Sequence, residues 1–236
     1  MKQIDCFYTL SSPWAYFAGP RLTELANKHG ADVVLRPYDF LKVVPLTGGI
    51  PLRTRLQPRQ HYHAIELDRW RSFLGMPLNL KPRFYPPDNG PATHAVIAAK
   101  QAGLDAMRLS HAILRALWAE ERNTADQTTL IAIADECGID GRELFASQTG
   151  LPVRAEFADN SADAIARGVF GSPTYFFRDV PYWGQDRLGT FSIVRWPMTR
   201  RTFDTCRRAD RELLQRHLLE PRASADAFFG IQTHWR

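Results

Sequence analysis

Two serines and a proline, Ser11, Ser12 and Pro13, lie where an apolar, strand-like run passes into an amphipathic helical pattern. Serine is a preferred N-cap residue, because its side-chain oxygen accepts a hydrogen bond from an unpaired N–H of the first helical turn. The other unpaired N–H groups and the positive end of the helix dipole would also stabilise an anion such as a thiolate. The three residues therefore fit either a simple helix cap or a site that holds a reactive anion.

The elements that must position these residues form a β-α-β unit at the start of the chain. The patterns of residues 3–9 and 31–40 are typical of strands. Residues 13–29 carry an apolar face at helical spacing, and Gly30 follows in the usual C-terminal position. A unit of this size predicts two parallel neighbouring strands joined by a right-handed crossover.

A block of helical patterns from about residue 58 to 168 follows this unit. Glycine and proline separate its segments, and its leucine and aromatic stripes are typical of core packing. Strand patterns return at 172–179 and 180–184, separated by the turn-like Arg178 and Asp179. This order places the helical block inside an α/β domain rather than after it.

The composition is that of a globular protein without a membrane span. The 236 residues are 44% hydrophobic and 23% charged, enough for one large domain or one domain with a sizeable insertion. No run approaches the roughly 18 apolar residues that cross a bilayer. The N-terminal segment is too short and polar for a signal peptide, so a cytoplasmic location is expected.

Charge and metal-ligand patterns exclude two further classes. Nine arginines against five acids in residues 191–236 give +4 of the net charge of +5, so the rest of the chain is nearly neutral and nucleic-acid binding is not expected. Cys6, Cys137 and Cys206 are scattered, and the histidines lack ligand spacing. Neither a disulfide framework nor a metal site is predicted.

A β-α-β half and a β-β half that share one small sheet follow the thioredoxin plan. Sites on that fold lie at the junction of the first strand and first helix, where Ser12 and Pro13 stand. The fold also presents a proline before its third strand, opposite the helix start, and Pro173 has that position. The X-Pro bond there can be cis at modest cost.

The chain is similar to the 2-hydroxychromene-2-carboxylate isomerases, relatives of kappa-class glutathione transferases and DsbA-type oxidoreductases. The stretches that carry the resemblance are FYTLSSPWAYFA (7–18), ELDRWRSFLGMPL (66–78), LWAEERN (117–123) and ARGVFGSPTYFFRDVPYWGQDRL (166–188). The resemblance implies an α/β, thioredoxin-like fold with an inserted all-helical domain. The expected division is 1–45 with 165–200 for the thioredoxin-like part, 46–164 for the helical insertion, and 201–236 for a C-terminal extension of unknown role, with a helix at 203–219.

The redox relatives carry a Cys-x-x-Cys pair at the start of the first helix, and here the matching residues are Ser12, Pro13, Trp14 and Ala15. Dithiol–disulfide exchange within this site is excluded, because neither place has a sulfur. A thiol must then come with a cofactor, which the resemblance implies is glutathione. It assigns Ser12 as the donor that hydrogen-bonds the glutathione sulfur and lowers its pKa, although an N-cap role alone would also suit serine.

The resemblance also assigns the rest of the cofactor site. Gln185 would hold the carboxylate of the γ-glutamyl end and Asp186 its ammonium group. Ser172, beside Pro173, would pair its backbone with the cysteinyl part, and Arg59 would reach the glycyl carboxylate. The alternatives are that Asp186 only caps the helix, with Arg187 as a surface partner, and that the charge of Arg59 is simply solvated.

The implied reaction is glutathione-dependent isomerisation of 2-hydroxychromene-2-carboxylate or a similar aromatic pyruvate in aromatic-compound breakdown. A thiolate adds to a conjugated double bond, the bond rotates, and elimination follows. Trp14, Tyr85 and Trp183, with Phe84, would suit an aromatic substrate, although each, taken singly, is more typical of the core than of a pocket. Gly49 stands where many relatives carry an asparagine, which puts the native substrate in doubt.

Two other functions stay open at this level. One is a kappa-like glutathione transferase or peroxidase acting on hydrophobic electrophiles. The other is a thioredoxin-fold binding protein that holds a thiol peptide without chemistry. Dimers are common among the relatives, so a homodimer is also open.

Overall fold

The computed structural model describes residues 2–147 and 150–191. These belong to one compact unit of the chain. The predicted extension 201–236, its helix at 203–219, and Cys206 lie outside the described residues. The split into a thioredoxin-like part and a helical insertion stays a prediction.

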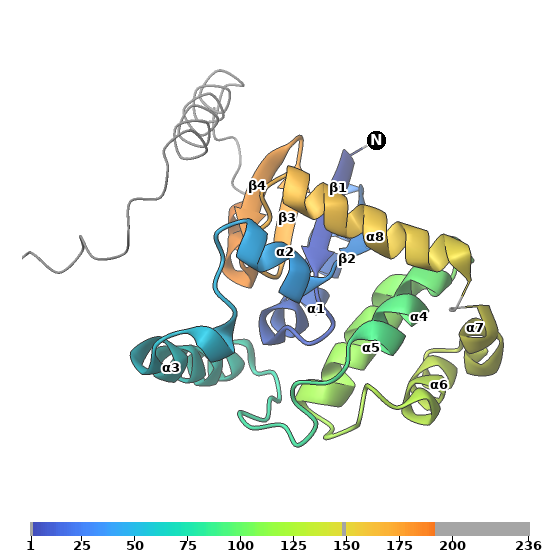
Figure 1. The fold of residues 1–236 in the computed structure, drawn as a ribbon, viewed down its shortest axis with the longest axis horizontal. Coiled ribbons are helices and arrows are strands. Elements are labelled where there is room, and N and C mark those ends of the chain that lie inside the picture. Colours follow the sequence, from blue (N-terminus) through green and yellow to red (C-terminus); the bar gives the residue numbers. More distant parts are fainter. Residues whose placement is uncertain (1, 148–149, 192–236) are drawn as a thin grey trace, which may run out of the picture. The chain divides into compact units, whose positions relative to one another are not determined.

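A four-stranded mixed sheet organises the described residues (Figure 1). Its strands are β1 (Lys2–Tyr8), β2 (Ala31–Pro37), β3 (Thr174–Phe177) and β4 (Val180–Trp183), in the order β2-β1-β3-β4. β1 pairs parallel with β2 and antiparallel with β3, and β3 pairs antiparallel with β4. The predicted thioredoxin-like topology is confirmed.

Successive side chains of β1 point to opposite faces of the sheet, and each face packs in its own hydrophobic core. Cys6 and Tyr8 join a large core with α1 (Pro13–His29), α4 (Gly90–Gln101) and α5 (Ala106–Trp118). Phe7 points to the other face, in a smaller core with α2 (Phe40–Leu46) and α8 (Leu151–Ala166). Figure 1 shows α1 and α8 on opposite sides of the strands. The period of two along β1 thus fixes which helices lie on each face.

Helix α1 has the predicted bounds, because strong local signals define both of its ends. Ser12 is its N-cap, Pro13 supplies a preset φ at the first position, and Gly30 ends it at φ +56°. These signals need no distant contacts. They place Ser12 at the end of the turn that follows β1.

The second strand is shorter than predicted. Residues 31–40 were expected to be extended, but β2 ends at Pro37 and Phe40 already begins α2. The side chain of Asp39 accepts a hydrogen bond from the Lys42 N–H at 3.1 Å and caps this helix. An aspartate N-cap therefore outweighs the β-like composition of the segment.

The remaining elements between the two halves of the sheet are η1 (Leu52–Thr54), α3 (Gln57–Leu74), α6 (Gln127–Glu136) and α7 (Gly141–Ser147). After β4 come η2 (Gln185–Arg187) and α9 (Leu188–Phe191). The predicted helical block is present, but α8 within it was not separately predicted. Among the described residues, no helix has the length and apolar character required to cross a membrane.

The hairpin between β3 and β4 turns through Arg178 and Asp179, with φ values of 51° and 63°. Two consecutive residues with positive φ are typical of the turns that suit the twist of a two-residue hairpin. The predicted turn is therefore present, and it brings β4 and the segment after it back toward the start of α1.

Candidate active site at the start of helix α1

Ser12 lies at the N-terminal start of α1, where its hydroxyl makes two hydrogen bonds. Its Oγ accepts from the Ala15 N–H at 3.2 Å and donates to the Ser172 carbonyl oxygen, also at 3.2 Å. The residue is 6% exposed. Ser12 is thus a helix cap, as the simpler interpretation holds, and it also bridges to a segment 160 residues away.

Ser172 and Pro173 form the wall opposite the helix start, and the peptide bond between them is cis. The Ser172 hydroxyl accepts a hydrogen bond from the Thr9 N–H at 3.0 Å, and the Pro173 carbonyl accepts from the Gly184 N–H at 2.9 Å. The predicted meeting of Ser12 with the segment at Pro173 is observed. Strand β1, helix α1 and the β3–β4 hairpin all fix its geometry.

One N–H group of the first turn of α1 has no hydrogen-bond partner in the part of the chain that the structure describes. Pro13 has no N–H, that of Ala15 is capped by Ser12, and that of Tyr16 donates to the Ser12 carbonyl at 3.1 Å. Among the described residues, no hydrogen bond uses the Trp14 N–H. The helix start therefore offers one backbone donor and the positive end of the dipole to an anion.

A pocket of about 600 Å³ adjoins this junction. Its lining includes six of the predicted site residues: Trp14, Arg59, Ser172, Trp183, Gln185 and Asp186. Further lining residues come from α3 and the turn before it, among them Arg55, Tyr62, His63, Glu66 and Trp70. Residues distant in sequence thus surround one cavity next to Ser12.

Gln185 is 2% exposed and begins the short helix η2. Its side-chain oxygen accepts a hydrogen bond from Arg21 Nη1 at 2.5 Å, and its backbone carbonyl accepts from the same nitrogen at 3.1 Å. Arg21 lies on α1 and was missed by the sequence reasoning. No local signal pairs it with Gln185, because the two are 164 residues apart.

The turn before η2 requires a glycine. Gly184 has φ 103° and ψ 152°, a region open essentially to glycine, and a Cβ there would meet Asp186 Oδ1 at 2.5 Å. Asp186 also forms a 3.5 Å ion pair with Arg187. The predicted ammonium partner thus lines the pocket, and its surface pairing, the alternative interpretation, is present too.

A histidine that the sequence reasoning did not select also lines the pocket. The Trp14 indole N–H donates to His63 Nε2 at 3.1 Å, and the two rings meet edge to face. Burial, and secondarily the charge of Arg55, lower the pKa of His63 to about 4. The imidazole is therefore neutral at physiological pH and carries its proton on Nδ1.

Two arginines give this wall of the pocket a positive character. Burial and the nearby charge of Arg59 lower the pKa of Arg55, whose Nε donates to the Ile50 carbonyl at 2.7 Å. Two neighbouring guanidinium groups favour a carboxylate between or beside them. Arg59 was predicted as a carboxylate partner, whereas Arg55 was missed.

The predicted aromatic residues separate into two groups. Trp14 and Trp183 line the pocket, and Trp183 is 49% exposed, with Phe170 against its ring. Tyr85 does not line it, and its ring packs on Trp118 at 4.9 Å. The prediction of Tyr85 as a pocket residue is therefore corrected: it belongs to the packing of the helical block.

Gly49 occupies a crowded place rather than an open one. A Cβ at this position would meet the Phe170 carbonyl oxygen at 2.4 Å and Val44 Cγ1 at 2.5 Å. An asparagine could enter only if the backbone moved. The loop is packed in a way that requires glycine, so this chain has closed the space of the missing polar side chain.

The described cysteines cannot supply a nucleophile. Cys6 and Cys137 are free and buried, and burial raises the pKa of both thiols, with that of Cys6 well above its ordinary value. Among the described residues, no group of three metal-ligating side chains could hold a metal ion. The site therefore offers donors to an external anion and no sulfur of its own.

The fold and the site define a class: a thioredoxin-like protein whose first helix starts with serine, not cysteine, opposite a proline. A family model described as DSBA-like thioredoxin domain matches residues 3–193, so the chain belongs to that family. It is 28% identical to 2-hydroxychromene-2-carboxylate isomerase of Sphingobium xenophagum over 79% of this chain and 94% of that protein. The enzyme of the same name from Pseudomonas putida is 27% identical, over 78% and 90%.

Solved structures agree on the fold. A 2-hydroxychromene-2-carboxylate isomerase superposes with a TM-score of 0.68 at 23% identity, covering 86% of this chain and 98% of that one. The cytosolic disulfide reductase DsbM of Pseudomonas aeruginosa, solved with GSH, gives 0.60 at 23% identity, covering 82% and 98%. The resemblance inferred from the sequence motifs is confirmed.

Proposed function

We propose that this protein is a glutathione-dependent isomerase acting on 2-hydroxychromene-2-carboxylate or a similar aromatic pyruvate. The observation that carries the proposal is the Ser12–Ser172 junction, where a sulfur-free helix start lies beside the 600 Å³ pocket. The curated relatives with the isomerase name supply the reaction class.

The residues that line the pocket, together with Ser12 beside it, fit each polar group of glutathione. The Trp14 N–H and the Ser12 hydroxyl suit a thiolate, and the Gln185 amide suits a carboxylate. Asp186 suits an ammonium group, and Arg59 suits a second carboxylate. One tripeptide carries all four groups.

Ser12 acts by exchanging its hydrogen-bond partner. In the structure its proton is donated to the Ser172 carbonyl, and a hydroxyl rotates at little cost. When an amide N–H of the ligand takes over that carbonyl in strand fashion, the Ser12 proton becomes available to the thiolate. The Ala15 N–H keeps the Ser12 oxygen in place throughout. Glutathione, when bound, supplies the thiolate that adds to the substrate's double bond and leaves after rotation.

The aromatic and cationic wall suits the second substrate. Trp14, held by His63, and Trp183 offer flat apolar surfaces, and Arg55 supplies a charge for a carboxylate. Because its pKa is lowered to about 4, His63 is neutral and adds no positive charge to this wall. An aromatic acid is the substrate class that combines these features.

The test is a spectrophotometric assay of 2-hydroxychromene-2-carboxylate isomerisation with and without glutathione. Turnover that requires glutathione supports the proposal. Turnover of an electrophile such as a chloronitrobenzene, without isomerisation, would instead assign the kappa-like transferase function. Binding of glutathione without either reaction would assign the non-catalytic binding function. The cytoplasmic location and the homodimer remain predictions.

A further inference from the structure

Arg21 determines which way the amide of Gln185 points. A guanidinium has only donors, so the side-chain atom 2.5 Å from Arg21 Nη1 must be the amide oxygen. The same nitrogen holds the backbone carbonyl of Gln185 at 3.1 Å, which fixes the residue at two points. The NH₂ end of the amide is therefore forced to the opposite side.

That NH₂ group has no partner in the described part of the chain. None of the hydrogen bonds there uses Gln185 Nε2, and this nitrogen is not among the unpaired polar atoms that are sealed from solvent. Gln185 is 98% buried in all, yet it lines the pocket beside Ser172. The accessible remainder of the side chain includes its donor end.

We propose that Arg21 is a positioning residue that converts Gln185 into an obligatory hydrogen-bond donor for the carboxylate at the γ-glutamyl end of glutathione. This rests on the proposed function and assigns a role to a residue outside the pocket. Without Arg21 the amide could turn its oxygen toward the carboxylate, which would repel it. Arg21 lies on the helix that Ser12 caps, so one helix positions the groups proposed for the thiolate and for the γ-glutamyl carboxylate.

The test measures glutathione affinity by titration calorimetry, independently of turnover. Gln185→Glu is isosteric, keeps an oxygen for Arg21 and loses the NH₂ donor, so it should bind glutathione roughly 10- to 100-fold more weakly. Arg21→Met should weaken binding by a factor of about three to ten, since the freed amide keeps its donor in one of two orientations. Arg21→Lys, which keeps a positively charged donor nitrogen, should recover part of this loss.

A matched ligand separates positioning from general damage to the turn. 4-Aminobutyryl-cysteinyl-glycine lacks only the carboxylate in question and keeps the ammonium group. The wild-type protein should bind it more weakly than glutathione, and neither Gln185→Glu nor Arg21→Met should weaken it further by more than about twofold. Arg142→Met, a change to an exposed arginine on α7, serves as the control for loss of an arginine.

Two results would overturn the inference, and they differ in what else they affect. Equal losses of affinity for glutathione and for the carboxylate-free peptide would show that Arg21 and Gln185 only support the fold, and the proposed function would stand. Failure of the wild-type protein to bind glutathione at all would remove both the inference and the proposed function. Circular dichroism of each variant verifies that it is folded.

Discussion

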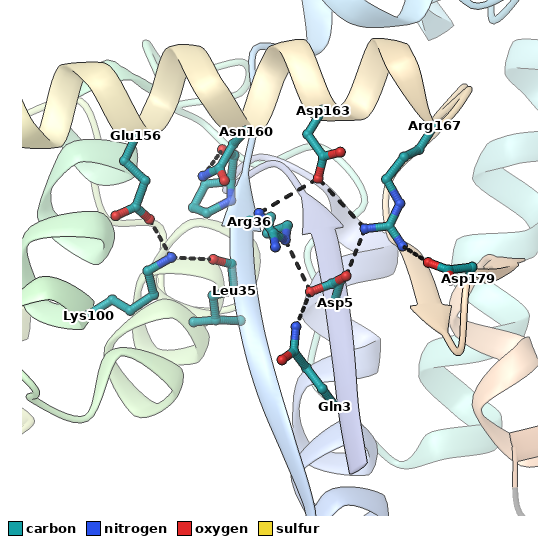
Figure 2. Close-up of polar contacts among 11 residues, drawn as sticks. Gln3, Asp5, Leu35, Arg36, Lys100, Glu156, Asn160, Asp163, Arg167 and Asp179 are labelled. Atoms are coloured by element: carbon teal, nitrogen blue, oxygen red, sulfur yellow. Dashed lines mark hydrogen bonds and ion pairs between the residues drawn. The ribbon is translucent and has the colours of Figure 1, made fainter. Parts of the chain in front are cut away.

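Two polar clusters on the same small sheet are built in opposite ways. On the face covered by α8, Asp5 of β1 lies in a network of charges (Figure 2). At the start of α1, Ser12, Ser172 and Gln185 form the pocket cluster. Both bury polar groups in a protein interior. They differ in whether the chain itself satisfies those groups.

In the charge network, both carboxylate oxygens of Asp5 accept hydrogen bonds from arginine or glutamine side chains. Arg167 donates to one oxygen at 2.7 Å, and Arg36 and Gln3 donate to the other at 3.1 and 2.8 Å. Burial would raise the pKa of Asp5, but these hydrogen bonds outweigh it and the pKa is lowered. Arg167 also stacks on the ring of Phe176 at 3.8 Å. Such saturation serves stability.

In the pocket cluster, donors are held in place but left open. The Gln185 amide is fixed through its oxygen alone, and the Trp14 N–H has no partner among the described residues. The Ser12 hydroxyl donates to the Ser172 carbonyl, an acceptor that the N–H group of a bound ligand could use instead. A polar group costs free energy if it is buried unsatisfied, so open donors beside a cavity indicate a ligand. The contrast predicts different consequences of mutation.

The largest effect is expected in the network, on stability alone. Arg167→Met leaves one Asp5 oxygen unpaired and should lower the free energy of unfolding by about 3 kcal/mol. Chemical denaturation measures this loss, with Arg142→Met as the control. Glutathione affinity of the folded protein should stay unchanged. A large drop in affinity at full folding would mean that the network also shapes the pocket, and the comparison would fail.

The second effect is expected at Ser12, on chemistry more than on stability. Ser12→Ala removes a donor to the thiolate and should lower glutathione-dependent turnover by about 100-fold, while loss of the cap costs about 1 kcal/mol of stability. The pKa of bound glutathione should rise, which thiolate absorbance in the ultraviolet can follow. If the variant loses only stability and keeps its turnover, Ser12 is a cap and nothing more.

Local signals explain how far the sequence could predict these clusters. The Ser12 cap, Pro13 and Gly30 define α1 within the chain itself, so that helix was predicted with its correct bounds. The family motif placed Gln185 and Asp186 in the pocket. The start of α2 was missed although its signal, the Asp39 cap, was present, because the β-branched run before it dominated the pattern.

Other residues had no local signal to find. Arg21 meets Gln185 across 164 positions, and His63 meets Trp14 across 49. Such pairs form only when the sheet brings the β3–β4 hairpin and α3 to the start of α1. The Asp5–Arg167 pair, 162 residues apart, is of the same kind. Tyr85 shows the reverse error, since an aromatic residue suited to a pocket packs on a neighbouring helix instead.

The third effect concerns Gly49, in the loop that packs against Phe170 and Val44. Gly49→Asn restores the side chain found in many relatives, but its Cβ would press on the Phe170 carbonyl, so it should cost about 1–3 kcal/mol of stability. Gly48→Asn is the comparison variant: its Cβ meets nothing, so its cost comes only from the backbone φ of 84°, which strains asparagine less than most other residues. Thermal unfolding should rank Gly49→Asn clearly below Gly48→Asn. Equal stabilities would mean that the loop is free to open and that glycine is not required there.

The smallest effect is a pH dependence that distinguishes the two clusters. The folded pKa of His63 is about 4, lowered by burial and by Arg55 from an ordinary 6.5, so the unfolded state takes up a proton first as the pH falls. Stability from His63 is therefore complete above about pH 6.5 and is lost as the pH falls toward 4. Asp5, with its pKa lowered, keeps its contribution above its ordinary 3.8 and loses it only at lower pH. His63→Gln should flatten the stability profile between pH 6.5 and 4 relative to wild type, measured by denaturation at each pH, while the control Arg142→Met should leave the slope in that window unchanged. An unaltered slope in His63→Gln would show that the Trp14–His63 contact tolerates protonation, and the pocket wall would then accept a third positive charge beside Arg55 and Arg59.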